Sequence, residues 1–133
     1  RLTNHEKGAP EILQIKGRNL HVPQALMGVA RFDFKDLCDQ PLGPADYLKI
    51  AHHYHTVFIE NIPALTSAER NQAKRFVTLI DALYESKVKL IASSEVKADD
   101  IYKEGDGQFE FGRTVSRLNE MRSEDYLALG HGT

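Results

Sequence analysis

The chain has 133 residues, of which 41% are apolar and 27% charged, and its formal net charge is −2. This length suits a single domain, and the near-neutral balance gives no general attraction to nucleic acid or to an anionic membrane. No apolar run approaches the roughly 20 residues that span a bilayer. The single cysteine, Cys38, excludes an intramolecular disulfide and fits a reducing compartment. Because the chain starts at Arg1 rather than at methionine, we expect it to be the interior of a longer polypeptide.

The first quarter of the chain predicts a β-hairpin. Residues 1–10 read as a loose leading segment. The runs 11–16 and 19–22 then flank a Gly-Arg dipeptide, which suits a tight turn between two strands. Pro23 should end the second strand, because proline cannot donate a hydrogen bond to a ladder.

A strand and two helical stretches are expected next. Residues 29–34 alternate apolar and polar side chains, which predicts a half-buried strand, and a short helical turn should follow at 35–38. Pro44 suits the first position of a helix, because the N–H that proline lacks would have no partner there. This helix should run to about Tyr54.

The centre of the chain predicts a strand–helix–strand unit. Residues 56–59 and 88–92 are apolar runs without alternation, as in strands buried on both faces. Thr66 followed by Glu69 fits a capping box, so a helix should start near Ser67. One stripe of apolar residues runs along that helix: Phe76, Leu79, Ile80, Leu83 and Tyr84. The sequence thus predicts an α/β fold, with a small, mostly parallel sheet, flanking helices and an N-terminal β-hairpin.

The last third of the chain is less regular. A short strand is expected at 108–111, and a helix at 113–121. A further helical turn should cover 124–129, and the terminal residues 130–133 are expected to form a mobile tail. The whole chain, 1–133, is treated as one domain.

Polar residues at strand ends are the first candidate ligand site. Glu60 follows the apolar run at 56–59, and Ser93 and Ser94 follow the run at 88–92. In parallel sheets the carboxyl ends of strands face the ligand crevice, and a strand closed by an acid is also how a Walker B strand presents its carboxylate. The alternative is that these are ordinary polar ends of buried strands.

A pair of arginines is the second candidate site. Arg113 and Arg117 lie four residues apart and share one face of the expected helix. Arginine binds phosphate through two parallel hydrogen bonds, so the pair suits a phosphate group. The alternative is a surface helix in which the arginines form salt bridges with Glu110 or Glu120.

No resident cofactor or metal is expected in this segment alone. The sequence contains no Gly-x-x-x-x-Gly-Lys-Ser/Thr loop, so it lacks the backbone cradle for the phosphates of a nucleotide. His52 and His55 lie three apart, but no other Cys or His pair completes the three or four ligands that zinc requires.

Four ordered blocks of sequence resemble one protein family. They are VARFDFKDLC at 29–38, PLGPADY at 41–47, RFVTLIDALY at 75–84 together with VKLI at 88–91, and FGRTVSRLNEM at 111–121. This set resembles the carboxyl-terminal half of the ZapE/AFG-type P-loop ATPases, over roughly residues 11–127. The resemblance implies an ATPase related to the AAA+ class, whose Walker A loop and Walker B acids lie in the amino-terminal half.

The resemblance also implies a function for the parent protein. ATP and Mg would be bound by the intact parent, and hydrolysis would be coupled to action on a protein partner, with homo-oligomers as a further expectation. Bacterial members act in cell division, so a bacterial parent would be cytoplasmic and would meet the membrane only through partners. A eukaryotic parent would be mitochondrial and act in protein quality control. The alternative is a non-catalytic module that docks partners for an ATPase core elsewhere.

Overall fold

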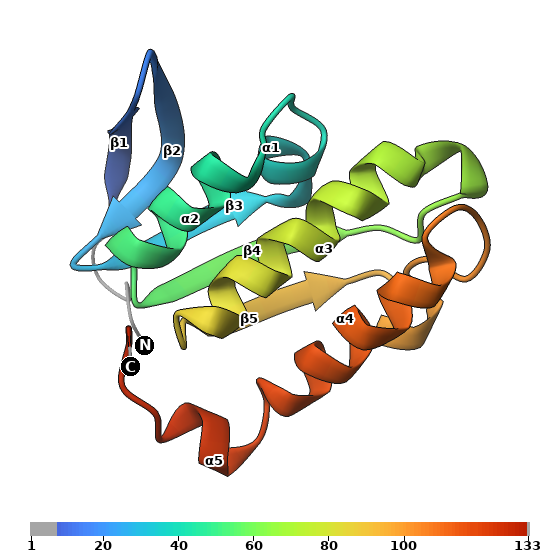
Figure 1. Cartoon of the computed structure of the whole chain (residues 1–133). Helices are drawn as coiled ribbons and strands as arrows, with labels where there is room; N and C mark the ends of the chain where they lie inside the picture. Colours follow the sequence, from blue (N-terminus) through green and yellow to red (C-terminus); the bar gives the residue numbers. More distant parts are fainter. Residues whose placement is uncertain (1–7, 133) are drawn as a thin grey trace.

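A computed structural model describes residues 8–132, which form one five-stranded sheet with helices packed against it (Figure 1). The strands are β1 (Ala9–Ile15), β2 (Arg18–Leu26), β3 (Val29–Asp33), β4 (Thr56–Ile62) and β5 (Lys89–Ser94). The helices are α1 (Phe34–Cys38), α2 (Pro44–His53), α3 (Arg70–Glu85), α4 (Gln108–Glu120) and α5 (Glu124–Leu127), with 3-10 turns η1 (Ser67–Glu69) and η2 (Ala98–Asp100). The strand order is β1-β2-β3-β4-β5, and the pairs are antiparallel up to β3 and parallel from β3 to β5. The predicted α/β class is confirmed.

The N-terminal hairpin is present, but it is longer than predicted. Strand β1 begins at Ala9, so residues 9 and 10 belong to the sheet rather than to a loose segment, and residues 1–7 lie outside the described part. Pro23 does not end β2, because the register shifts between Ala9 and Glu11 and gives β2 one extra residue there. Such a bulge leaves a position that need not donate to the ladder, which is where proline is tolerated within a sheet.

The predicted strand–helix–strand unit forms β4, α3 and β5. The amide of Thr66 donates to Oε1 of Glu69 at 2.8 Å, which completes the expected capping box. The first turn after it is the 3-10 turn η1, and the α-helix begins only at Arg70. Helix α3 then crosses the sheet between two parallel strands, in which Val57 pairs with Leu90.

Helix α3 buries the predicted apolar stripe in the core. Phe76, Leu79, Ile80 and Leu83 have no exposed surface, and Tyr84 at the end of the stripe is half-buried. The ring of Phe76 lies 5.9 Å from the rings of both Phe34 and Phe111, so α3 ties α1 and α4 into one core.

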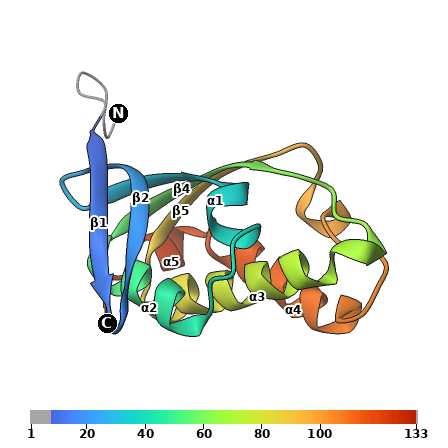
Figure 2. The same ribbon diagram turned by 90° about the horizontal axis from the view of Figure 1, so that it is seen from above.

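The last strand of the sheet is less buried than its sequence suggests. The helices lie on one side of the sheet (Figure 2), and β5 is the edge strand on the far side from β1. Ile91 is therefore 44% exposed, whereas residues 88–92 were expected to be buried on both faces. On the open face of β4, Phe58 is half-buried beneath the guanidinium of Arg31, whose Cζ atom lies 4.4 Å from the ring centroid.

The C-terminal helices differ from the expectation in one place. The strand predicted at 108–111 is wrong, because α4 starts at Gln108. Gly107, with φ of 85°, turns the chain sharply into the helix, and this left-handed conformation favours glycine. In the tail, the amide of Gly132 donates to the carbonyl of Ser86 at 2.7 Å; the mobility expected for 130–133 stays a prediction. Within residues 8–132, no helix is both long and apolar enough to cross a membrane.

We expect Leu79→Ala to lower the free energy of unfolding by about 2 to 5 kcal/mol, through lost burial and the cavity left behind. Urea unfolding measured by circular dichroism tests this value. Lys74→Ala, on the exposed side of the same helix, is the matched control and should change stability by less than about 0.5 kcal/mol. A loss below about 1 kcal/mol for Leu79→Ala would contradict the central role of the stripe.

Candidate functional site

The carboxyl ends of the three parallel strands form a connected polar cluster. Asp33 of β3 pairs in register with Glu60 of β4, so the two strands end side by side. The side-chain amide of Asn61 donates to Oδ1 of Asp33 at 2.6 Å, and its backbone N–H donates to Oγ of Ser93 at 3.0 Å. The hydroxyl of Ser94 donates to the carbonyl of Ile62 at 3.0 Å. The structure thus brings the strand-end residues predicted from sequence to one edge of the sheet.

Glu60 is engaged within the sheet. Its carboxylate forms an ion pair with Arg31 on the neighbouring strand, and Arg31 also lies over Phe58. The side chains of Arg31 and Glu60 are 35% and 40% exposed, so the pair lies at the surface of the open face. A carboxylate already neutralised by a guanidinium is a weaker ligand for a cation than a free one.

Sequence reasoning missed three members of this region. Asp33 had a detectable signal, since it lies one residue before the end of a predicted strand and, with Asp36, forms the capping box of α1. Asn61 had a weaker one: it adopts φ of 62°, in the left-handed region where asparagine is enriched among non-glycine residues. Arg31 had none, because its partner Glu60 lies 29 positions away and is found only through the pairing of β3 and β4.

The two candidate arginines have different surroundings. Arg117 turns toward α3, where it forms an ion pair with Asp81 and its Cζ atom lies 4.9 Å from the ring centroid of Tyr84. The hydroxyl of Tyr84 donates to Oε2 of Glu120 at 2.8 Å, and this hydrogen bond raises the pKa of Tyr84. The alternative role foreseen for Arg117, a salt bridge, is thus present, although the partner is Asp81 rather than Glu110 or Glu120.

Arg113 lies on the exposed side of α4. Within residues 8–132 it has no ion pair or side-chain hydrogen bond, and its guanidinium is available to another molecule. Within residues 8–132, no hydrogen bond or ion pair joins Arg113 or Arg117 to Glu60, Ser93 or Ser94. The strand ends and the helix are therefore two separate candidate sites.

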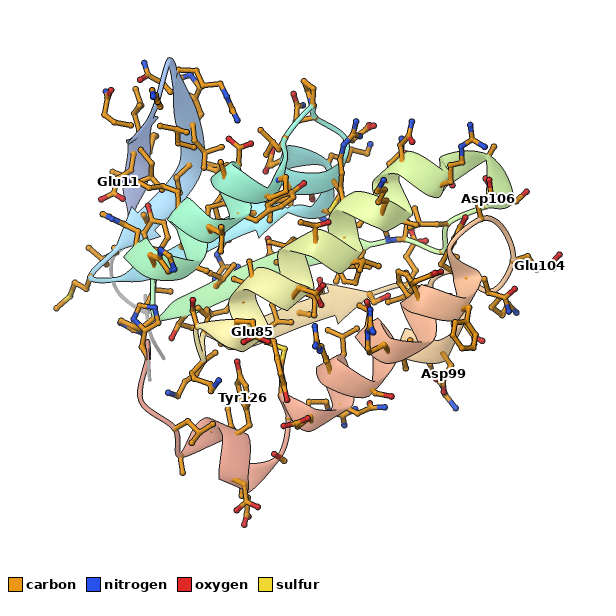
Figure 3. The ribbon with its side chains drawn as sticks, viewed as in Figure 1. Glu11, Glu85, Asp99, Glu104, Asp106 and Tyr126 are labelled. Atoms are coloured by element: carbon orange, nitrogen blue, oxygen red, sulfur yellow. The ribbon has the colours of Figure 1, made fainter. Side chains whose placement is uncertain are left out.

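A cavity of about 530 Å³ lies between α3 and α4. Its floor includes the buried rings of Tyr102 and Phe111. On its rim, Arg70 forms an ion pair with Asp106 at 3.1 Å, and Lys74 has no ion pair among the described residues. Figure 3 shows Asp106 on the loop that leads into α4. The rim of the cavity thus carries charged side chains of both signs around apolar side chains.

The described residues do not fit a complete ATP and Mg site. The sequence has no phosphate-binding loop, and residues 8–132 contain no group of three or more His, Cys, Asp and Glu side chains able to hold a metal ion. Cys38 is fully buried, and burial raises the pKa of its thiol, so it is not a reactive nucleophile. His55 is held at the start of β4, where its Nδ1 lies 2.8 Å from Oγ1 of Thr56.

Comparison with known proteins places the chain in a family. The family described as AFG1-like ATPase matches residues 1–129. Cell division protein ZapE of Escherichia coli (strain K12) is 39% identical over 115 residues, covering 84% of this chain and 31% of that protein. Lactation elevated protein 1 homolog B of Danio rerio is 33% identical over 153 residues, covering 91% of this chain and 30% of that protein. No solved structure matches the chain.

The fold and the strand-end cluster define an α/β protein with a mixed sheet, in which polar groups gather at the carboxyl ends of the parallel strands β3, β4 and β5. The chain belongs to the AFG1-like ATPase family, which confirms the resemblance found in its sequence. It spans about a third of the length of the curated relatives it matches. Membership of an ATPase family implies dependence on a nucleotide and Mg for the parent protein.

We expect Arg117→Ala to lower the free energy of unfolding by about 1 kcal/mol, because it removes both the ion pair with Asp81 and the stacking on Tyr84. Arg113→Ala, one turn away and without such partners, is the control and should stay within about 0.5 kcal/mol of the unmutated chain. Thermal or urea unfolding of the three proteins measures both values. Equal stability of the two variants would mean that the contacts of Arg117 are not structural.

Proposed function

We propose that the chain is the carboxyl-terminal portion of an ATP-hydrolysing P-loop ATPase that couples hydrolysis to action on a protein partner. The observation that carries this proposal is the family match over residues 1–129 in a sequence without a phosphate-binding loop. ATP and Mg are then bound by the rest of the parent protein. This segment would then provide the parent with a five-stranded sheet, the helices packed on it and the surface residues that they carry.

Arg113 is the best candidate in this segment for contact with a nucleotide. It carries a guanidinium without an ion pair in the described part of the chain, whereas the guanidinium of Arg117 is held by Asp81 and Tyr84. An arginine that reaches phosphate from outside the nucleotide site stabilises negative charge on the phosphate oxygens. In several ATPases and GTPases such a residue comes from a neighbouring molecule.

The setting of the proposed activity follows the relatives. ZapE is named as a cell division protein, and a bacterial parent would act in the cytoplasm, meeting the membrane through its partners. A eukaryotic parent would be mitochondrial and act in protein quality control. Neither nucleic acid nor direct insertion into a membrane is part of this proposal.

A second candidate function is a non-catalytic module that docks protein partners. The observations that favour it are Phe109, which is 92% exposed at the start of α4, and the apolar-floored cavity between α3 and α4. Exposed aromatic side chains and apolar clefts are both frequent at protein interfaces, although Phe109 does not itself line this cavity. The two candidates differ in whether changes to this segment alter ATP hydrolysis or only partner binding.

The isolated chain should bind ATP with Mg no more tightly than about 1 mM, because it lacks the backbone cradle for the phosphates. Isothermal titration calorimetry with ATP and magnesium measures this directly, and the longer parent protein provides the positive control. Micromolar affinity of the isolated chain would show that it contains a nucleotide site of its own.

In the longer parent protein, Arg113→Ala should retain ATP binding and reduce the rate of hydrolysis by about 10-fold or more. Arg113→Lys should not restore the rate, because an ammonium group cannot make the planar two-pronged contact. Arg122→Ala, at an exposed arginine just beyond α4, is the matched control. Hydrolysis at the unmutated rate by Arg113→Ala would remove Arg113 from the proposed site and favour the docking module.

A further inference from the structure

The outer half of the N-terminal hairpin pairs only with itself. Strand β2 pairs with β3 over residues 24–26, whereas residues 18–22 of β2 pair with residues 11–15 of β1. The hairpin therefore extends beyond the sheet and stands beside α2 (Figure 1, Figure 2). We call residues 11–22 the arm. Because no ladder within residues 8–132 joins the arm to β3, the contacts of its side chains hold it in place.

The arm meets the sheet where the pairing of its two strands is irregular. The register of β1 and β2 shifts between Ala9 and Glu11, so β2 carries one extra residue there. Pro23 lies in this stretch and has no N–H to donate to the ladder. The bulge and the proline together interrupt the hydrogen bonds that would make the arm continuous with the sheet. This junction is therefore the place about which the arm can turn as one body.

The arm packs on α2 through a narrow apolar face. Leu13, Leu20 and Val22 are buried, whereas Ile12, on the other face of β1, is 53% exposed. Three buried side chains remove much less apolar area from water than the stripe of α3 does, so the arm is held less firmly than the centre of the sheet.

At the tip of the arm, Arg18 reaches a carboxylate that is buried in α2. Nη2 of Arg18 donates to Oδ2 of Asp46 at 2.6 Å, and Nη1 lies 2.5 Å from Oδ1. Asp46 has no exposed surface and is the only buried carboxylate among the described residues. Burial raises the pKa of Asp46, but hydrogen bonds from Arg18 and from the amide of Gly43 outweigh this effect, and the pKa lies below its ordinary value. Asp46 is thus charged at neutral pH, and within residues 8–132 Arg18 is the cation paired with it.

A second, weaker contact lies nearer the base of the arm, at Glu11, which Figure 3 shows on β1. The hydroxyl of Tyr54 donates to Oε1 of Glu11, and Nε2 of His53 lies 4.0 Å from the same oxygen. The side chains of Glu11 and His53 are 46% and 49% exposed, so water competes for this contact. Loss of the pair at the tip costs more, because it leaves a buried carboxylate without its cation.

We propose that the arm is a hinged element that opens as a unit about Pro23, and that the ion pair between Arg18 and Asp46 is the latch that holds it against α2. Opening uncovers the buried apolar face of the arm and lets water reach Asp46. Because an isolated two-stranded hairpin is only marginally stable, the paired amides of an open arm lose their protection against exchange with solvent. The central sheet and α3 stay folded during this opening.

Native-state hydrogen exchange followed by NMR on the 133-residue chain tests the latch. The paired amides of the arm should exchange through one common opening, at least about 10-fold more frequent than the opening that exposes the amides of α3. Arg18→Met should accelerate exchange in the arm by about 10-fold or more, because it leaves Asp46 buried without a cation. Asp46→Asn removes the same ion pair from the side of α2 and should also accelerate exchange in the arm.

Two control variants separate opening of the arm from unfolding of the whole chain. Ile80→Val weakens the core under α3, which stays packed when only the arm opens, so it should accelerate exchange in α3 and leave the arm unchanged. Lys16→Ala removes an exposed cation that has no ion pair within residues 8–132 and should leave the arm unchanged. The proposal is overturned if Ile80→Val accelerates the arm and α3 equally, or if Arg18→Met has no more effect on the arm than Lys16→Ala.

Discussion

The burial of α3 against the sheet and three neighbouring helices is the constraint on which the rest of the structure depends. Phe76 shows this most directly, because its ring contacts Phe34 of α1 on one side and Phe111 of α4 on the other. Once α3 is fixed on the sheet, the crossover determines that β4 and β5 are parallel and that their carboxyl ends point the same way. The polar residues at the carboxyl ends of β3, β4 and β5 therefore lie close together, and the outer face of α4 is exposed to solvent.

The parts of the fold that sequence predicted are those governed by local periodicity. The stripe on α3, the capping box before it and the hairpin each depend on residues a few positions apart. The exposure of Ile91 could not be read in this way, because it depends on which side the helices cover and on the absence of a neighbouring strand in residues 8–132. The start of α4 was missed because the left-handed Gly107 converts an apparent strand into the first turn of a helix.

The same contrast holds for the candidate sites: residues placed by a simple rule were predicted from sequence, and residues brought together by strand pairing were not. That Glu60 and Ser93 would lie at one edge followed from the rule that parallel strands end together, and the structure agrees. The residues around them did not follow, since Arg31, which pairs with Glu60, and Asp33, which accepts a hydrogen bond from Asn61, are far away in sequence and are brought near only by the register of β3. Arg113 and Arg117 have the expected spacing, yet only Arg117 faces α3, because two residues four positions apart on a helix still differ by some 40° in direction.

The unpaired edge of β5 has a consequence for how the sheet exchanges protons with water. The amide of Lys89 donates to the carbonyl of His55 at 2.9 Å, which sets the alternation of the strand. The amides of Leu90 and Ala92 then point away from β4, where the described chain offers no carbonyl to receive them. Deuterium should therefore enter β5 at every second peptide group, while the amides between them are protected together with the core. A strand added at this edge would erase that alternation, so isotope exchange in β5 reports whether the sheet ends there or continues into another polypeptide.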